Sequence, residues 1–191
     1  MSRVLIVGAG PTGLTAAVEL ARCGVIPRII DRRADASPFS RAVGILPSSA
    51  DILRPSGVTE ALQAEAVHFT GVALHDGPRR IAALPLNFDA HSRVLGLAQD
   101  RTEFHLAEAL HRYGGSVEYD TPFQGLEQDD TGVAATVAGQ TARYDYVIGA
   151  DGIGSAVRDQ LGLPFPGFDL PETWSIARTG AIRRCFRSSC W

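Results

Sequence analysis

The hydrophobic pattern changes its period twice near the start of the chain. Residues 4–7 form a continuous apolar run that is too short for a helix, and a glycine-rich turn follows at residues 8–13. Apolar side chains then recur at helical spacing over residues 14–21, and a second short apolar run covers residues 28–30. This order predicts a strand, a glycine turn, a helix and a second strand.

The glycine turn has the spacing that dinucleotide-binding proteins use. Gly8 permits a tight turn off the strand, and Gly10 has no side chain, so a pyrophosphate can approach its backbone closely. Gly13 lets the helix pack against the strand, and the N-terminus of the helix offers free N–H groups to phosphates. Asp31 lies 23 positions beyond Gly8, where a carboxylate can accept hydrogen bonds from both hydroxyls of a ribose. The sequence therefore predicts an adenine dinucleotide site, and the alternative is an ordinary βαβ unit with chance glycines.

A second strand-to-turn signal covers residues 146–155. An apolar run leads into Gly149-Ala150-Asp151-Gly152, and a short helix is predicted to follow. The end of such a strand would lie at the carboxyl edge of the sheet, where cofactors bind. For Asp151 alone, a plain strand-to-helix turn is an equally good interpretation. Two such turns in one chain favour an elongated dinucleotide held between them.

The segments between the two turns are mostly strand-like. Residues 67–84 predict an antiparallel hairpin, and such a hairpin is a common wall for a substrate. Residues 123–128, 133–137 and 143–146 predict a small β-meander. A short helix is expected over residues 48–54.

Two polar residues in these segments are candidates for the site, and two others are predicted to cap a helix. Arg41 lies in a polar loop after Asp31 and could neutralise a pyrophosphate, or could be an ordinary surface arginine. Gln99 precedes a predicted helix, and nucleotide contact and a plain polar strand end are equally good interpretations. Asp100 is predicted to cap this helix, with Glu103 three positions later completing a capping box.

The composition is that of an ordinary globular protein of 191 residues, with 45% hydrophobic and 20% charged residues. The net charge of −3 gives no case for a nucleic acid or an anionic membrane as partner. No apolar run approaches the roughly 20 residues of a membrane helix, and we expect no signal peptide. Three cysteines form no disulfide framework, so we expect a cytoplasmic protein. Cys185 and Cys190 lack a histidine at zinc-site spacing, so no metal is expected.

In combination, these stretches resemble the flavin-dependent aromatic monooxygenases of the p-hydroxybenzoate hydroxylase fold, especially those that act on polyketide or phenolic rings. Residues 8–14 with Asp31 and Arg32 are similar to the FAD fingerprint of this family, which often has proline where Pro11 stands. Residues 40–44 resemble the loop whose arginine contacts FAD, which places Arg41 in that role.

Further motifs extend the resemblance over residues 3–176. Residues 146–158, with Asp151 and Gly152, look like the Asp-Gly motif that this family associates with FAD and with transit of the nicotinamide cofactor. Gln99 matches a glutamine that reaches FAD in this family, and residues 161–167 match the segment that usually follows the Asp-Gly motif.

The resemblance implies an α/β fold: a Rossmann-like FAD-binding domain with a parallel sheet, a β-meander and part of an antiparallel substrate-domain sheet. We expect residues 1–66 and 93–163 to form the FAD-binding domain, and residues 67–92 and 164–177 to form part of the substrate domain. NADPH or NADH would reduce FAD, and a flavin C4a-hydroperoxide would hydroxylate a small aromatic substrate. No catalytic side chain is expected, because the flavin carries the chemistry.

Two features depart from the family pattern. Ser48 and Ser49 stand where the family often has an arginine-threonine pair. The family is also much longer, and a later Gly-Asp motif that contacts the flavin half of FAD is absent. Residues 178–191 are rich in arginine and have no clear period, so we expect a non-native tail produced by a frameshift or premature stop.

Two other functions compete with the monooxygenase interpretation. An NAD(P)-dependent dehydrogenase is possible because the first glycine turn alone does not distinguish FAD from NAD. A truncated, non-catalytic FAD-binding fragment is the other alternative. An unfinished sheet would expose an edge and an apolar face, so a homo-oligomer or a complementing fragment is a possible partner.

Overall fold

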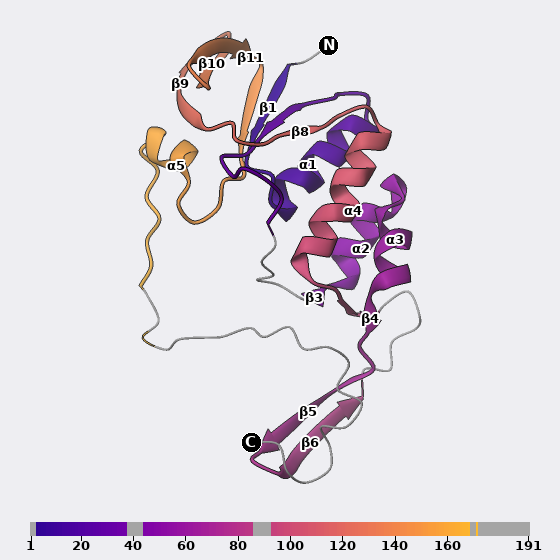
Figure 1. The fold of residues 1–191 in the computed structure, drawn as a ribbon. Coiled ribbons are helices and arrows are strands. Elements are labelled where there is room, and N and C mark those ends of the chain that lie inside the picture. The colour runs from indigo at the N-terminus through magenta and orange to yellow at the C-terminus, as the bar shows by residue number, and fades with distance from the viewer. Residues whose placement is uncertain (1–2, 38–43, 86–92, 169–170, 172–191) are drawn as a thin grey trace.

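The computed structural model describes residues 3–37, 44–85, 93–168 and 171. A four-stranded parallel sheet lies between a layer of helices and a small antiparallel sheet (Figure 1). A two-stranded hairpin extends from the end of the molecule that lies away from the antiparallel sheet. The predicted α/β class, with its parallel sheet and β-meander, is confirmed.

The parallel sheet has the order of the first four strands of a Rossmann fold. Its strands are β1 (Val4–Val7), β2 (Arg28–Ile30), β8 (Val117–Glu118) and β12 (Tyr146–Gly149). They run in the order β12-β1-β2-β8, and every neighbouring pair is parallel. In chain order this is 3-2-1-4 from the β8 edge, which places both glycine turns at the carboxyl ends of adjacent strands.

The alternation of side chains along β1 separates two cores. Ile6 packs with α1 (Pro11–Arg22) and α4 (Gln99–Arg112), where the core is made of leucine, valine and alanine side chains. Leu5 and Val7 point to the opposite face and pack under the antiparallel sheet. A strand with apolar residues on both faces is typical of a parallel sheet that is covered on both sides.

The second face is covered by the predicted β-meander. It consists of β9 (Phe123–Asp129), β10 (Gly132–Val137) and β11 (Gln140–Tyr144), with β10 in the middle. Alternate residues of β10 are buried against the parallel sheet, whereas the intervening ones are partly exposed. The short helix α5 (Ala156–Gln160) contributes Val157 to the same core.

The helical layer contains more helices than the sequence pattern indicates. The predicted helix at residues 48–54 is α2 (Pro47–Leu53), and a 3₁₀ turn, η1 (Arg54–Ser56), and α3 (Val58–Glu65) follow it. A further small sheet is formed by β3 (Gly44–Ile45), β7 (Leu95–Gly96) and β4 (Val67–His68).

An ion-pair cluster joins α3 to α4. Arg101 and His105 of α4 both contact the Glu65 carboxylate, at 2.7 and 2.8 Å. The hydrogen bonds from Arg101 and His105 lower the pKa of Glu65 to about 2.

The predicted hairpin is present as β5 (Gly71–Asp76) and β6 (Arg79–Pro85), paired in antiparallel fashion. It projects away from the parallel sheet, and nearly all of its side chains are exposed (Figure 1). Val72 pairs with Leu84, and Leu74 pairs with Ala82, so an apolar stripe lies along one face.

The predicted capping box at α4 is wrong. The helix begins at Gln99, Ala98 is the N-cap residue, and no side chain caps the helix through a hydrogen bond. Glu103 is instead buried inside the molecule, at 3% exposure. A glutamate at this position satisfies the sequence pattern of a capping box, but in the fold its carboxylate lies beside the side chains of Gln99 and Arg33.

The proposed domain boundaries remain a prediction. The tail at residues 178–191 lies outside the described residues, as do parts of the predicted substrate domain. Within the described ranges, no helix has the length and apolar character that crossing a bilayer requires.

Candidate functional site

The two glycine turns touch each other at the carboxyl edge of the parallel sheet. The Ala150 N–H donates to the Val7 carbonyl oxygen at 2.7 Å, which ties the second turn to the end of β1. Gly8 has a φ of +105°, and a Cβ at this position would lie 2.8 Å from the Cα of Asp151. Glycine is therefore required at position 8 both for its backbone conformation and for the close approach of the second turn.

Helix α1 starts directly after this contact. Gly10 is its N-cap residue, and Pro11 occupies the first turn, where the missing N–H removes no helical bond. A Cβ on Gly10 would meet nothing within 4 Å, so this glycine faces open space. A Cβ on Gly13 would overlap the carbonyl oxygen of Gly8, so this glycine permits close packing of helix against turn.

An open cleft of about 410 Å³ lies in front of the two turns and the N-terminus of α1. It is lined by eight of the residues that the sequence indicates: Gly8, Gly10 and Pro11 of the first turn, Asp31 and Arg32 after β2, Gln99 of α4, and Asp151 and Gly152 of the second turn. Gly13 supports the turn from inside, and Arg41 lies outside the described residues.

Asp31 presents an ionised carboxylate at the edge of the cleft. It accepts hydrogen bonds from the Ala9 N–H and the Arg33 N–H, both at 2.8 Å, and from the Arg33 guanidinium at 3.0 Å. Burial acts to raise its pKa, but the hydrogen bonds from Arg33 and Ala9 together lower the pKa below its ordinary value.

Arg33 and Glu103 also line the cleft, although the sequence pattern indicates neither of them as a site residue. The Gln99 side-chain amide donates to Glu103 Oε1 at 2.8 Å, and Arg33 Nη1 lies 3.6 Å from Glu103 Oε2. Glu103 stands four residues after Gln99, so both side chains lie on one face of α4. This spacing is a signal that could have identified Glu103.

The Asp151 carboxylate holds its own turn together. It accepts a hydrogen bond from the Ser155 hydroxyl at 2.6 Å and another from the Val157 N–H at 3.2 Å. Ser155 in turn caps α5 by accepting the Arg158 N–H at 3.0 Å. Gly152 has a φ of +82°, and a Cβ at this position would meet nothing within 4 Å. The second turn therefore borders the cleft with a glycine backbone that its aspartate stabilises.

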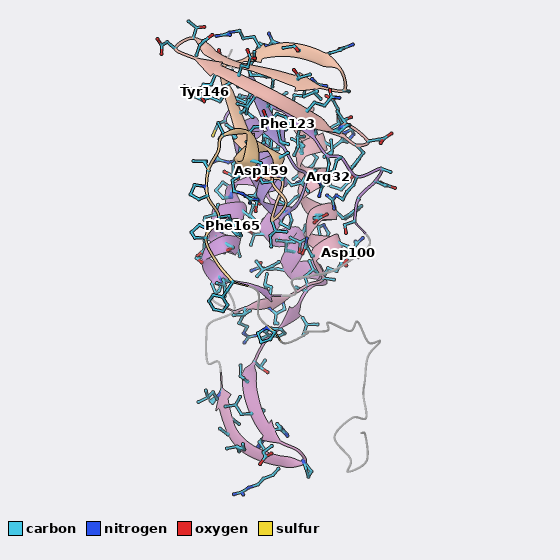
Figure 2. All side chains as sticks on the ribbon, turned by 90° about the vertical axis from the view of Figure 1, so that its left-hand side faces the viewer. Arg32, Asp100, Phe123, Tyr146, Asp159 and Phe165 are labelled. Carbon is cyan, nitrogen blue, oxygen red and sulfur yellow. The ribbon has the colours of Figure 1, made fainter. Side chains whose placement is uncertain are left out.

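A smaller hollow of about 110 Å³ adjoins the cleft on the side of the β-meander. Val7, Ile30 and Phe123 give it an apolar wall, and Asp31 and Arg32 separate it from the cleft. In the view of Figure 2, Arg32 lies between Phe123 of the meander and Asp100 near the start of α4. The site thus has a polar part and an apolar part on the two sides of Asp31.

Among the residues that the structure describes, no group of three or more histidine, cysteine, aspartate or glutamate side chains is placed to hold a metal ion.

Fold and cleft together define a dinucleotide-binding α/β domain, with a glycine turn, a helix N-terminus and a carboxylate in the arrangement that such ligands require. The chain belongs to the FAD binding domain family, whose model matches residues 1–181.

Individual relatives agree with this assignment. The chain is 36% identical over 188 residues to a 12-dehydrotetracycline 5-monooxygenase/anhydrotetracycline 6-monooxygenase of Streptomyces rimosus. The aligned region covers 94% of this chain and 36% of the relative. The flavin-dependent monooxygenase PieE, solved with FAD and substrate, matches with a TM-score of 0.80 and 29% identity, over 87% of this chain and 33% of that one. Aklavinone-11 hydroxylase, solved with FAD and aklavinone, matches with a TM-score of 0.74 and 30% identity, over 84% of this chain and 35% of that one.

The predicted resemblance to flavin-dependent aromatic monooxygenases is therefore confirmed. The chain spans about a third of the length of the curated relatives that it matches.

Proposed function

We propose that this chain binds FAD in the cleft and serves as the FAD-binding part of a monooxygenase that hydroxylates an aromatic, phenolic or polyketide substrate. NADPH or NADH would be the transient reductant. The observation that carries the proposal is the shared cleft of the two glycine turns, since a single extended dinucleotide can contact both.

The residues of the cleft fit the parts of an adenine dinucleotide. Open space at Gly10 and the N-terminus of α1 suit the pyrophosphate, because free N–H groups and the helix dipole both favour an anion. Asp31 suits the ribose hydroxyls of the adenosine half. The adjoining apolar hollow, with Phe123 on its wall, suits the adenine ring. Gln99 and Gly152 then remain for the flavin half.

When bound, FAD would supply the redox chemistry that links the nicotinamide cofactor, dioxygen and the aromatic ring. The protein residues would bind and orient the cofactor. The Asp151 carboxylate would keep the glycine turn in place, and the hydrogen bonds to Asp31 would keep this acid ionised at neutral pH.

An aromatic substrate is inferred from the relatives, whose names include tetracycline precursors and aklavinone. The exposed hairpin β5-β6 would belong to a substrate-binding layer formed from residues 67–92 and 164–177. We also propose the cytoplasm as the location, because its supply of reduced nicotinamide cofactor and the low cysteine content of the chain both favour it.

Titration of the purified chain with FAD, followed by quenching of flavin fluorescence, tests the proposal. We expect saturable binding of one FAD per chain, competed by ADP because ADP shares the adenosine and pyrophosphate groups. Binding of NAD in preference to FAD would contradict it and favour a dehydrogenase.

A second candidate function is FAD binding without hydroxylation by this chain alone. The apolar stripe of Val72, Leu74 and Leu84 is exposed, which favours a partner such as a second copy or a complementing fragment. Oxidation of NADPH coupled to a hydroxylated product by the purified chain would exclude this candidate. Flavin binding with no product would support it.

A further inference from the structure

All acceptor positions of the Asp31 carboxylate are engaged in this structure. A carboxylate offers about four such positions on its two oxygens. Oδ1 accepts from the Arg33 N–H at 2.8 Å and from Arg33 Nε at 3.0 Å, and Oδ2 accepts from the Ala9 N–H at 2.8 Å and from Arg33 Nη2 at 3.0 Å. The two bonds from the guanidinium are the ones that a side-chain movement can release.

Glu103 offers a second position for the same guanidinium. Its Oε2 atom is buried and accepts no hydrogen bond from any described residue, whereas Oε1 is held by Gln99 at 2.8 Å. Arg33 Nη1 already lies 3.6 Å from Oε2. A buried carboxylate oxygen without a donor is unfavourable, so it gains from the approach of a cation. A shift of about 1 Å would bring the pair to the distance of a charge-assisted hydrogen bond.

We propose that Arg33 exchanges Asp31 for Glu103 when the cleft binds an adenine nucleotide, and that this exchange opens Asp31 to the ribose. The inference rests on the proposed function, because it requires a ligand with ribose hydroxyls. Two guanidinium hydrogen bonds leave Asp31, and two hydroxyls of the ribose replace them. The backbone N–H groups of Ala9 and Arg33 continue to orient the carboxylate. Glu103 is thus a positioning residue that acts through Arg33 and sets the affinity for the nucleotide.

Calorimetric titration with ADP and with 2′,3′-dideoxy-ADP tests this exchange. The Glu103→Gln variant removes the charge that receives Arg33 and keeps the size of the side chain. We expect its Kd for ADP to rise about tenfold, because one charge-assisted interaction is lost. Its Kd for dideoxy-ADP should not change, since that ligand makes no demand on Asp31. Glu108→Gln is the matched control, because Glu108 is an exposed glutamate of the same helix and lies outside the cleft.

The Arg33→Ala variant provides the second arm. Without the guanidinium, Asp31 is open to the ribose in every state, so we expect preference for ADP over dideoxy-ADP to be at least as large as in the unmodified chain. Adding Glu103→Gln to this variant should then have no further effect on that preference. This arm also applies if Glu103→Gln alone does not fold.

Three results would overturn the exchange: an unchanged Kd for ADP in Glu103→Gln, an equal loss of affinity for both nucleotides, or loss of the ADP preference in Arg33→Ala. Failure of the unmodified chain to bind ADP or FAD would be a different result, and would overturn the proposed function together with the exchange.

Discussion

Replacement of Gly10 by valine should separate ligand binding from folding. Gly10 has a φ of −76° and a ψ of −178°, which any residue adopts, and a Cβ there would meet nothing within 4 Å. Valine is a poorer N-cap residue than glycine by up to about 1 kcal/mol, but it also reduces the entropy of the unfolded chain by a similar amount. We therefore expect the free energy of unfolding to change by less than about 1 kcal/mol.

The same substitution should strongly weaken FAD binding. The valine side chain would occupy the open space through which a pyrophosphate reaches the N–H groups of α1. The loss of two hydrogen bonds to a charged group, at about 1.5 kcal/mol each, corresponds to roughly a hundredfold rise in Kd.

Urea unfolding and fluorescence titration with FAD measure the two effects on the same preparation. Gly167→Val is the control, because Gly167 also has open space around its Cα and lies outside the cleft. Unchanged FAD affinity in Gly10→Val would refute the assignment of this turn to the pyrophosphate. A large loss of stability would refute the expectation that the fold tolerates a side chain at position 10.

Substitutions at three further positions test the residues that support the site. Gly13→Ala should destabilise the fold by about 1–3 kcal/mol in urea, because the new Cβ would overlap the carbonyl oxygen of Gly8. Asp31→Asn should lower the melting temperature at neutral pH. Because folding lowers the pKa of Asp31, its contribution is present above the unfolded pKa of about 3.9 and is lost as the pH falls through the lower folded pKa, so the two melting temperatures should converge in acid. Convergence on raising the pH would contradict this sign. Ser155→Ala should reduce stability by about 1 kcal/mol through loss of the α5 cap, while Ser155→Thr should retain most of it; equal losses in both would argue against capping.

The local parts of the site could be predicted because their signals are local. Residues 4–31 show the change of period from strand to helix, and the glycines mark the turn between them, so the βαβ unit follows from the sequence. The second turn could be predicted for the same reason. Asp151 lines the cleft, and its role at the ligand stays a prediction; the hydrogen bonds of its carboxylate to Ser155 and Val157 are a feature that the local pattern does not indicate.

The parts that depend on tertiary packing could not be predicted. Asp100 and Glu103 satisfy the local pattern of a capping box, but α4 starts two residues earlier, with Ala98 as its N-cap residue, and packs beside α1, which turns Glu103 inward. The side chain then reaches Arg33, which lies 70 positions earlier in the chain. Arg32 and Arg33 are adjacent and chemically identical, so only the fold distinguishes the one that pairs with Asp31.

The central claim is that two glycine turns, far apart in the sequence, hold one FAD molecule between them. Fluorescence titration of Gly152→Asn with FAD tests this claim most directly, because asparagine tolerates a φ of +82° and places a side chain in the cleft from the second turn. We predict one FAD per unmodified chain and at least a tenfold rise in Kd in Gly152→Asn, with the stability of the fold retained. Unchanged FAD affinity in this correctly folded variant would contradict the claim.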